Sequence, residues 1–277
     1  MKSKITIRDI RKLKEDATPF ATVTAYDYVS AQNADSAGIP LLLVGDSAAM
    51  VIYGMDNTIP ISMDELIFLT RAVSRGVKNA LVVADMPFMS YQSSTEDAVR
   101  NAGRFVKESG AEAVKLEGGT AYTSQIKAIM EAGIPVMGHV GLLPQSYHLS
   151  SGYRIQGKSK LEAEKIKEDA LAVQDCGAFA VVLEGIPADL AEEITAMLEI
   201  PTIGIGAGPH CDGQIQVLHD IIGLYNDHTP KHSKQYSDLS TQMQDALKCY
   251  KTEVEKKQFP AESHYILRKN PTAKVSS

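Results

Sequence analysis

Short apolar runs alternate with longer amphipathic segments along most of this 277-residue chain. Six of the apolar runs end in an acidic residue or a histidine, and they cover residues 22–27, 41–46, 81–85, 114–117, 136–139 and 181–184. A seventh run covers residues 202–205, and a weaker eighth covers residues 214–218. Continuous apolar runs of this length are typical of strands buried in a parallel sheet. The chain is therefore predicted to contain eight parallel strands.

The segments between the strands carry helix signals. Residues 94–110 give the clearest case, because Ser94 is followed by acidic residues, an apolar stripe and a terminating Gly110. The same order recurs at residues 62–76, 122–133, 159–177 and 187–201. Alternating strands and helices of this kind indicate a single-domain α/β protein, a (β/α)8 TIM barrel.

The barrel is expected to cover residues 20–230, with an N-terminal helix before it. A C-terminal helical extension is expected over residues 231–265, with its amphipathic helix at residues 239–256. Residues 266–277 are expected to form a disordered tail. Two long connections, at residues 48–61 and 140–158, leave the C-terminal ends of their strands, so they are either lids over a substrate or plain surface loops.

Charge and cysteine content narrow the class of protein. The chain has 28 basic and 34 acidic residues and a net charge of −6, which argues against nucleic-acid binding. Its three cysteines form no CxxC pair, as expected for reduced thiols. The N-terminus lacks the apolar core of a signal peptide, and no run approaches ~18 uncharged apolar residues. We therefore expect a cytoplasmic protein without a membrane span.

Polar residues at the ends of parallel strands meet at the C-terminal mouth of a barrel, where such folds place their chemistry. Asp46, Asp85, Glu117 and Glu184 are expected to project into this mouth. Lys115 joins them, because residues two apart on a strand share a face. Four crowded carboxylates repel one another, and one lysine neutralises only one of them. A bound divalent cation would relieve this repulsion, and oxygen ligands favour Mg²⁺ over structural zinc.

Each of these residues also has a purely structural interpretation. Asp46 could cap the segment after its strand, Asp85 could simply end its strand, and Lys115 could pair with Glu117. A lysine that points into a barrel is nevertheless costly unless it binds something. The joint interpretation as a ligand site is therefore stronger than any single member.

Three further features are weaker signals. His139 is more often a hydrogen-bonded histidine at a strand end than a ligand, and Asp27 is more consistent with scaffold than with chemistry. The glycine cluster at residues 204–208 either binds a phosphate through backbone N–H groups or makes a tight turn.

Several short motifs, taken together, are highly specific. They lie at residues 24–27, 44–47, 84–88, 114–119, 138–142, 144–146, 152–157, 183–184 and 204–208. Through them the chain resembles the ketopantoate hydroxymethyltransferase family over residues 6–265. The resemblance implies a barrel of the phosphoenolpyruvate mutase and isocitrate lyase type, and a homo-oligomer that is often a decamer. It also implies transfer of a hydroxymethyl group from the co-substrate 5,10-methylenetetrahydrofolate to 3-methyl-2-oxobutanoate, on the route to pantothenate and coenzyme A.

The resemblance also implies roles for the residues at the mouth. The implied ligands of one Mg²⁺ per subunit are Asp46, Asp85 and Glu117, and the implied ketoacid-binding residues are Asp46, Ser47, Asp85, Lys115 and His139. Glu184, in a drier part of the mouth, corresponds to the general base that removes the C3 proton of the ketoacid. The chain departs from the family pattern at residues 48–49, 151 and 232, which concern the lids and the folate side.

Other functions are weighed against this one. A Mg²⁺-dependent 2-oxoacid lyase or mutase of the same superfamily typically carries a lysine–cysteine motif on the lid, and residues 140–158 contain no cysteine. A glycosidase also uses paired carboxylates, but sugar platforms favour tryptophan and the chain has none. A non-catalytic metabolite-binding barrel would tolerate the loss of the Glu184 carboxylate, whereas the enzyme would not.

Overall fold

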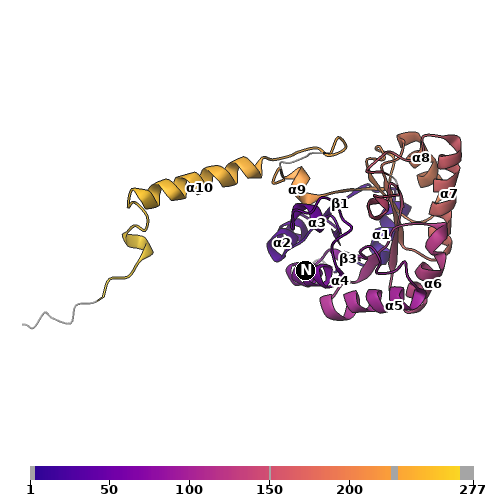
Figure 1. Ribbon diagram of the computed structural model, residues 1–277, viewed down its shortest axis with the longest axis horizontal. Helices are drawn as coiled ribbons and strands as arrows, with labels where there is room; N and C mark the ends of the chain where they lie inside the picture. Colours follow the sequence, from indigo (N-terminus) through magenta and orange to yellow (C-terminus); the bar gives the residue numbers. More distant parts are fainter. Residues whose placement is uncertain (1–3, 150, 226–229, 269–277) are drawn as a thin grey trace, which may run out of the picture.

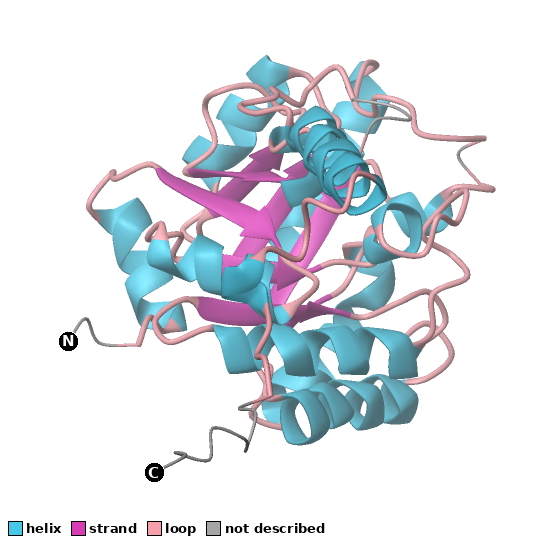
Figure 2. Ribbon diagram, turned by 90° about the vertical axis from the view of Figure 1, so that its left-hand side faces the viewer, coloured by secondary structure: helices cyan, strands magenta, loops and turns pink. Residues whose placement is uncertain are grey.

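The computed structural model describes residues 4–149, 151–225 and 230–268. Its eight strands are all parallel and close into a barrel in chain order. Figure 2 shows the strands in the middle of the molecule, surrounded by helices. They are β1 (Phe20–Thr24), β2 (Leu41–Val44), β3 (Leu81–Asp85), β4 (Ala113–Lys115), β5 (Val136–Gly141), β6 (Ala180–Glu184), β7 (Thr202–Ile205) and β8 (Gly213–Gln216). The barrel closes where β8 pairs with β1, with Gly213 opposite Phe20. The predicted (β/α)8 barrel is confirmed.

Helices cover the outside of the barrel and occupy the two chain ends. The α-helices are α1 (Ile7–Glu15), α2 (Tyr28–Ser36), α3 (Ala48–Val51), α4 (Met63–Gly76), α5 (Thr95–Arg104), α6 (Thr123–Glu131), α7 (Lys160–Asp175), α8 (Ala188–Met197), α9 (Leu218–Ile221) and α10 (Leu239–Glu255). Shorter helical turns are η1 (Phe105–Ser109), η2 (Thr120–Tyr122), η3 (Pro144–Ser146) and η4 (Glu262–His264). The N-terminal helix and the C-terminal extension are thus both present.

Local sequence explains where several helices begin and change form. Ser62 begins α4 because its side chain accepts a hydrogen bond from the backbone of Glu65, whose carboxylate binds back. The helix predicted at residues 94–110 departs from α geometry in its last turn, which is the π-helical η1. There Ser109 Oγ donates to the Phe105 carbonyl, which loosens the regular backbone pattern.

Asp27 begins α2, a helix that the apolar pattern does not single out. Its carboxylate accepts hydrogen bonds from Val29 N at 2.8 Å and Ser30 N at 2.9 Å. This is an N-cap of the usual kind, so Asp27 belongs to the scaffold, as expected. The weak eighth strand ends at Gln216 rather than at residue 218, because Leu218 already begins α9.

Residues alternate along each strand between the barrel interior and the helix layer. Leu81 and Val83 of β3 belong to the interior cluster, whereas Val82 and Ala84 pack among the helices. The N-terminal end of the interior is closed by α1, whose fully buried Ile10 joins the interior cluster. The opposite, C-terminal end is therefore the end at which polar side chains and a ligand have room.

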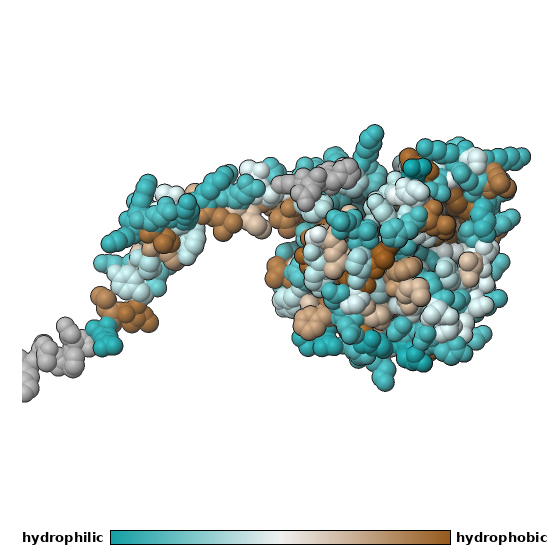
Figure 3. All heavy atoms as spheres, viewed as in Figure 1, coloured by the Kyte–Doolittle hydropathy of each residue, from teal (hydrophilic) through white to brown (hydrophobic). Residues whose placement is uncertain are grey.

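The C-terminal extension leaves the barrel. Figure 1 shows α10 projecting away from the rest of the molecule, and none of its residues is buried. Apolar side chains gather along it (Figure 3), and the exposed ones on α10 are Met243, Leu247, Tyr250 and Val254. The predicted tail lies mostly at residues 269–277, outside the described part of the chain. None of the described helices combines the length and the apolar character needed to cross a membrane.

Candidate active site

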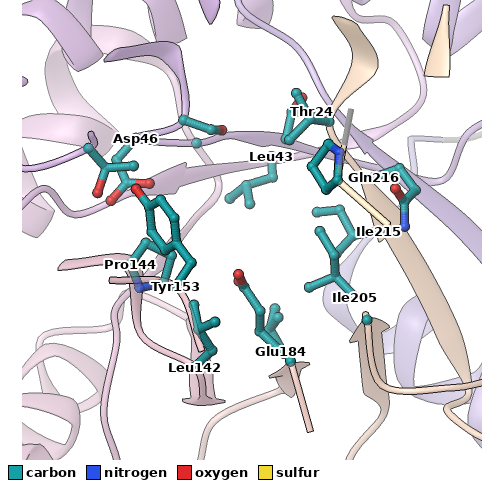
Figure 4. Close-up of a pocket in the computed structure, with 18 of the residues that line it drawn as sticks. Thr24, Leu43, Asp46, Leu142, Pro144, Tyr153, Glu184, Ile205, Ile215 and Gln216 are labelled. Carbon is teal, nitrogen blue, oxygen red and sulfur yellow. The ribbon is translucent and has the colours of Figure 1, made fainter. Parts of the chain in front are cut away.

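A cavity of about 500 Å³ opens at the C-terminal ends of the strands. Its lining includes every residue that the sequence places at the mouth, namely Asp46, Ser47, Asp85, Lys115, Glu117, His139 and Glu184. Figure 4 shows Glu184 pointing into the cavity, with Asp46 and Tyr153 on one side and Ile215 and Gln216 on the other. A cavity of this size accommodates small organic ligands.

Strand alternation explains how most of these side chains arrive in the cavity. Asp85, Lys115 and Glu184 are the last residues of β3, β4 and β6. Each lies two residues beyond a member of the interior cluster, so each continues the inward face of its strand. Asp46 and Glu117 differ, because they follow the ends of β2 and β4 and are placed by the turns after those strands.

Lys115 is the central cation of the cavity. Its Nζ lies 2.8 Å from Asp85 Oδ1 and 3.9 Å from Glu117 Oε1, and the lysine side chain is only 5% exposed. Burial alone would lower the pKa of Lys115, but the charges of Asp85 and Glu117 outweigh it and raise this pKa. Lys115 is therefore charged and bound to carboxylates before any ligand arrives.

His139 joins two acidic residues across the cavity. Its Nε2 lies 3.2 Å from Glu184 Oε2, and its Nδ1 lies 3.6 Å from Glu117 Oε1 and 3.3 Å from Lys115 Nζ. Burial and Lys115 oppose protonation of the ring, yet the two carboxylates raise the pKa of His139 to about 9. In turn, burial of Glu117 is outweighed by His139 and Lys115, which lower the pKa of that carboxyl group.

Asp46 and Asp85 form the part of the cavity with excess negative charge. Burial, followed by the charges of Asp85 and Glu117, raises the pKa of Asp46 well above its ordinary value. Burial also raises the pKa of Asp85, although Lys115 opposes this shift. Two buried carboxylates in such a position either take up protons or bind a cation.

The donor set fits a magnesium ion. Carboxylate oxygens are hard ligands, and Mg²⁺ in proteins is typically held by one or two carboxylates together with water and substrate oxygens. Within the described residues no three His, Cys, Asp or Glu side chains are grouped closely enough to enclose a metal ion unaided. Asp46 and Asp85 thus resemble an open magnesium site rather than a closed structural one.

Ser47 is fixed from behind by an aromatic residue. Its Oγ lies 2.8 Å from Tyr26 Oη, and Tyr26 is fully buried. A Cβ at Gly45 would lie 2.8 Å from Ser47 Oγ, so a larger residue there would displace this hydroxyl. The Ser47 hydroxyl is consequently held at the wall of the cavity.

Glu184 differs from the expectation of a drier environment. Its side chain is 20% exposed, whereas those of Glu117 and Asp85 are each 2% exposed. The reason is position, since Glu184 ends its strand beside the open part of the mouth, and Glu117 is covered by the connection between β5 and α7. Glu184 is accordingly the most accessible of the four carboxylates.

Both long connections contribute to the cavity wall. Met50 comes from the connection after β2 and Tyr153 from the connection after β5, and Tyr153 Oη lies 3.7 Å from Met50 Sδ. The two segments therefore meet over the mouth. The glycine cluster makes a turn, because Gly206 and Gly208 both have positive φ, and Gly206 lies against the ring of His232.

The sequence did not single out several residues of the site. Gln145, Tyr91 and Tyr153 lie on connections, where no periodic pattern tells which side chain turns inward. Gln145 and Tyr153 do fall within the motifs at residues 144–146 and 152–157, which was the available signal. Tyr91 lies outside those motifs, and its inward position follows only from the folded structure.

The barrel and its acidic mouth define the class of protein. A phosphoenolpyruvate phosphomutase from Streptomyces platensis subsp. rosaceus superposes with a TM-score of 0.62 at 14% identity, over 94% of this chain and 92% of that one. A phosphonopyruvate hydrolase in complex with oxalate and Mg²⁺ gives 0.61 at 13% identity, over 94% and 93%. At such low identity these likenesses establish the fold alone, a closed (β/α)8 barrel.

Within this class the sequence identifies the family. Residues 4–262 match the family model described as ketopantoate hydroxymethyltransferase. The 3-methyl-2-oxobutanoate hydroxymethyltransferase of Geobacter sulfurreducens is 55% identical over 259 residues, which are 94% of this chain and 97% of that protein. The chain belongs to the ketopantoate hydroxymethyltransferase family, and the resemblance inferred from its motifs is confirmed.

Proposed function

We propose that the chain transfers a hydroxymethyl group from 5,10-methylenetetrahydrofolate to 3-methyl-2-oxobutanoate and forms 2-dehydropantoate. Membership of the family supports this activity. The observation that carries it is the arrangement of the mouth, where Glu184 and the pair of Asp46 and Asp85 line one cavity with Lys115 and His139. Such a site offers a base, cation ligands and positive charge to a single 2-oxoacid.

Binding of the ketoacid is assigned to the side of the cavity that holds Lys115. Mg²⁺ held by Asp46 and Asp85, with Glu117 as the third carboxylate of the site, would act as a Lewis acid toward the ketone oxygen. Lys115 balances the negative charge of the bound acid, and the Ser47 hydroxyl donates a hydrogen bond to it. Since Lys115 is already held by Asp85, it needs little reorganisation on binding.

Glu184 is the proposed base. It removes the C3 proton of the ketoacid, and the charge that develops is spread over the enolate. His139, whose Nε2 lies 3.2 Å from Glu184 Oε2, faces the Glu184 carboxylate with positive charge. The C3 carbon then bonds to the methylene carbon of the folate as the first of its two C–N bonds breaks. Water adds to the same carbon as the second C–N bond breaks and supplies the hydroxyl oxygen of the product, while the C3 proton and one water proton pass to the two folate nitrogens. Ile205, Ile215 and Gln216, opposite Asp46 (Figure 4), form the proposed folate side.

Exchange of the C3 proton tests this proposal most directly. Protein supplied with Mg²⁺ and 3-methyl-2-oxobutanoate in heavy water, without folate, is expected to replace the C3 proton by deuterium. Glu184→Gln is expected to slow this exchange about 10³-fold, because the base is lost. Glu199→Gln, an exposed residue outside the cavity, serves as the matched control. Unchanged exchange in Glu184→Gln would assign the base to another residue, and no exchange in either protein would favour a non-catalytic binding barrel.

We also propose that the chain works as a homo-oligomer, a decamer by the family resemblance. The exposed stripe of Met243, Leu247, Tyr250 and Val254 on α10 supports a second copy of the chain as its cover. Light scattering after size-exclusion chromatography is expected to show a smaller assembly for Leu247→Glu. Thr252→Glu, on the opposite side of α10, is expected to keep the wild-type mass. Equal masses for both variants would exclude the stripe as an interface.

A further inference from the structure

Gln145 has a buried side-chain amide and lies near the start of the connection between β5 and α7. It lies in η3, directly after Pro144, and is 4% exposed. The proposed chemistry makes no use of it, although it contacts two of the three proposed metal-site carboxylates. A buried amide has four hydrogen-bonding positions to satisfy, so its partners show what it does.

The side chain of Gln145 can adopt only one amide orientation. Its Nε2 donates to Asp46 Oδ2 at 3.0 Å and to the Met86 carbonyl at 2.9 Å. Its Oε1 accepts from Tyr91 Oη at 3.1 Å and from Gln92 Nε2 at 3.2 Å. Reversing the amide would set donors against donors and acceptors against acceptors, so the NH₂ group faces Asp46.

The backbone of Gln145 holds a second carboxylate. Its N–H donates to Glu117 Oε2 at 3.0 Å. Tyr91 braces the same region, because its Oη accepts from Glu117 N at 3.1 Å and lies 3.0 Å from the Glu117 carbonyl oxygen. The single Tyr91 hydrogen serves either that carbonyl or Gln145 Oε1. Gln145 and Tyr91 thus fix both the main chain and the side chain of Glu117.

These contacts occupy one oxygen of each carboxylate. Asp46 Oδ2 and Glu117 Oε2 are bound by Gln145, which orients Asp46 Oδ1 and Glu117 Oε1. Groups that hydrogen-bond to metal ligands set their orientation, and their loss typically weakens metal binding about 10- to 100-fold. Mg²⁺ demands near-ideal octahedral geometry, whereas Ca²⁺ tolerates irregular sites, so a rigid pair of carboxylates favours the smaller ion.

We propose that Gln145 is a positioning residue that sets the affinity and the size selectivity of the divalent-cation site at Asp46 and Asp85. The inference rests on the proposed function, because it assumes that a cation binds there. It goes further by assigning the geometry of that site to an amide outside the ligand set. It also ties the covering connection to the site, since Gln145 belongs to that connection.

Calorimetric titration of the intact protein with Mg²⁺ and with Ca²⁺, in the absence of substrates, tests the proposal. Gln145→Met keeps the length of the side chain but removes the amide, and its Mg²⁺ affinity is expected to fall about tenfold. Its Ca²⁺ affinity is expected to fall less, so the preference for Mg²⁺ shrinks. Gln156→Met, on the same connection, is the matched control, because among the described residues Gln156 donates hydrogen bonds to the carbonyls of Gly185 and Arg154 and not to the site carboxylates.

Tyr91→Phe removes a single hydroxyl and is expected to weaken Mg²⁺ binding about threefold. Combined with Gln145→Met it should add little, because both residues act through one network. This variant also decides the question by itself if Gln145→Met does not fold. A lowered thermal midpoint with unchanged cation affinities would indicate a merely structural role and overturn the proposal.

The two proposals fail in distinguishable ways. Wild-type protein that binds neither cation contradicts the proposed metal site, and the role of Gln145 falls with it. Wild-type protein that binds Mg²⁺ and exchanges the C3 proton, together with variants of unchanged affinity and selectivity, overturns only the role of Gln145. Weaker binding and lower selectivity in Gln145→Met, with Gln156→Met unchanged, is the result that supports it.

Discussion

Both ends of the barrel hold an ion pair, one half-buried and one buried, and the surroundings of the two pairs differ. At the N-terminal end, Lys14 Nζ lies 2.8 Å from Asp212 Oδ2 and donates to the Thr195 carbonyl at 3.0 Å. Asp212 Oδ2 also accepts from Thr202 N at 2.8 Å. At the mouth, Lys115 Nζ lies at the same 2.8 Å from Asp85 Oδ1, within a more deeply buried pair.

The two ends differ in how many of their charged groups have an ion-pair or hydrogen-bond partner. At the N-terminal end one cation meets one anion, and backbone groups together with the Thr202 hydroxyl complete the network. At the mouth, four carboxylates face Lys115 and His139, and hydrogen bonds of good geometry are lacking, within the described residues, for Asp85 Oδ1, Glu117 Oε1 and His139 Nε2. A network in which every charged group is paired and hydrogen-bonded stabilises a fold. A network with unpaired polar atoms does not, and those atoms remain able to bind a ligand.

The largest expected effect comes from removing one charge at the mouth. Asp46→Asn keeps the shape of the side chain but loses a proposed metal ligand, so activity is expected to fall about 10³-fold. Because Asp46 adds to an excess of negative charge, the cation-free variant should be at least as stable as wild type. Steady-state kinetics and thermal melting check the two parts. A large loss of stability would show that the mouth is a structural network after all.

The opposite pattern is expected at the N-terminal end. Asp212→Ala leaves Lys14 without its anion and Thr202 N without its acceptor, so the free energy of unfolding should fall by about 2–3 kcal/mol. Activity of the folded protein should stay near the wild-type level, since Asp212 lies outside the cavity lining. Urea denaturation measures the loss. Asp16→Ala removes the exposed pair with Lys12 and should leave the urea midpoint close to that of wild type.

A smaller effect is expected in the pH dependence of the unfolding free energy, which depends on a fully hydrogen-bonded carboxylate at the N-terminal end of the barrel. Asp35, near the N-terminal end of β3, accepts from the backbone N–H groups of Lys78, Asn79 and Ala80. Burial opposes its charge, but these hydrogen bonds lower the pKa of Asp35 in the folded state. Its stabilisation is therefore present above the unfolded pKa, about 3.9, and is lost as the pH falls through the lower folded pKa.

Asp35→Asn is expected to remove this dependence. The variant should lose about 2 kcal/mol of unfolding free energy at pH 7, and the difference from wild type should narrow as the pH falls below about 4. Denaturant titrations at several pH values measure it. Asp189→Asn, a residue on the exposed side of α8, supplies the control. A constant difference across this range would mean that the Asp35 charge is not what stabilises the loop.

Strand periodicity made the barrel predictable from the sequence, together with the side chains that extend it. Asp85, Lys115 and Glu184 continue the inward face of their strands, so alternation alone places them in one mouth. Their chemical roles stay predictions. The exposure of Glu184 and the inward turn of Gln145 were not predictable, because both depend on how a connection folds over the mouth, and connections carry no periodic signal.

Gln145 shows this limit most clearly. Its motif at residues 144–146 marks the segment, but any of its three side chains could have turned inward. The choice is made by Asp46, Met86 and Tyr91, which are far from it in sequence and meet it only in the folded barrel. Contacts between residues so far apart in sequence arise only in the tertiary structure, so no local pattern predicts them.

The smallest expected effect is the response of stability to magnesium, and it compares the two ends in one experiment. A ligand that binds only the folded state at ten times its dissociation constant stabilises it by about 1.4 kcal/mol. For a chain of this size, such a change raises the thermal midpoint by about 2–3 °C. Wild type and Asp212→Ala should both show this rise, because the N-terminal end takes no part in binding. Asp46→Asn should show none, whereas an equal rise in all three proteins would place the cation elsewhere and remove the basis for treating the mouth as an open site.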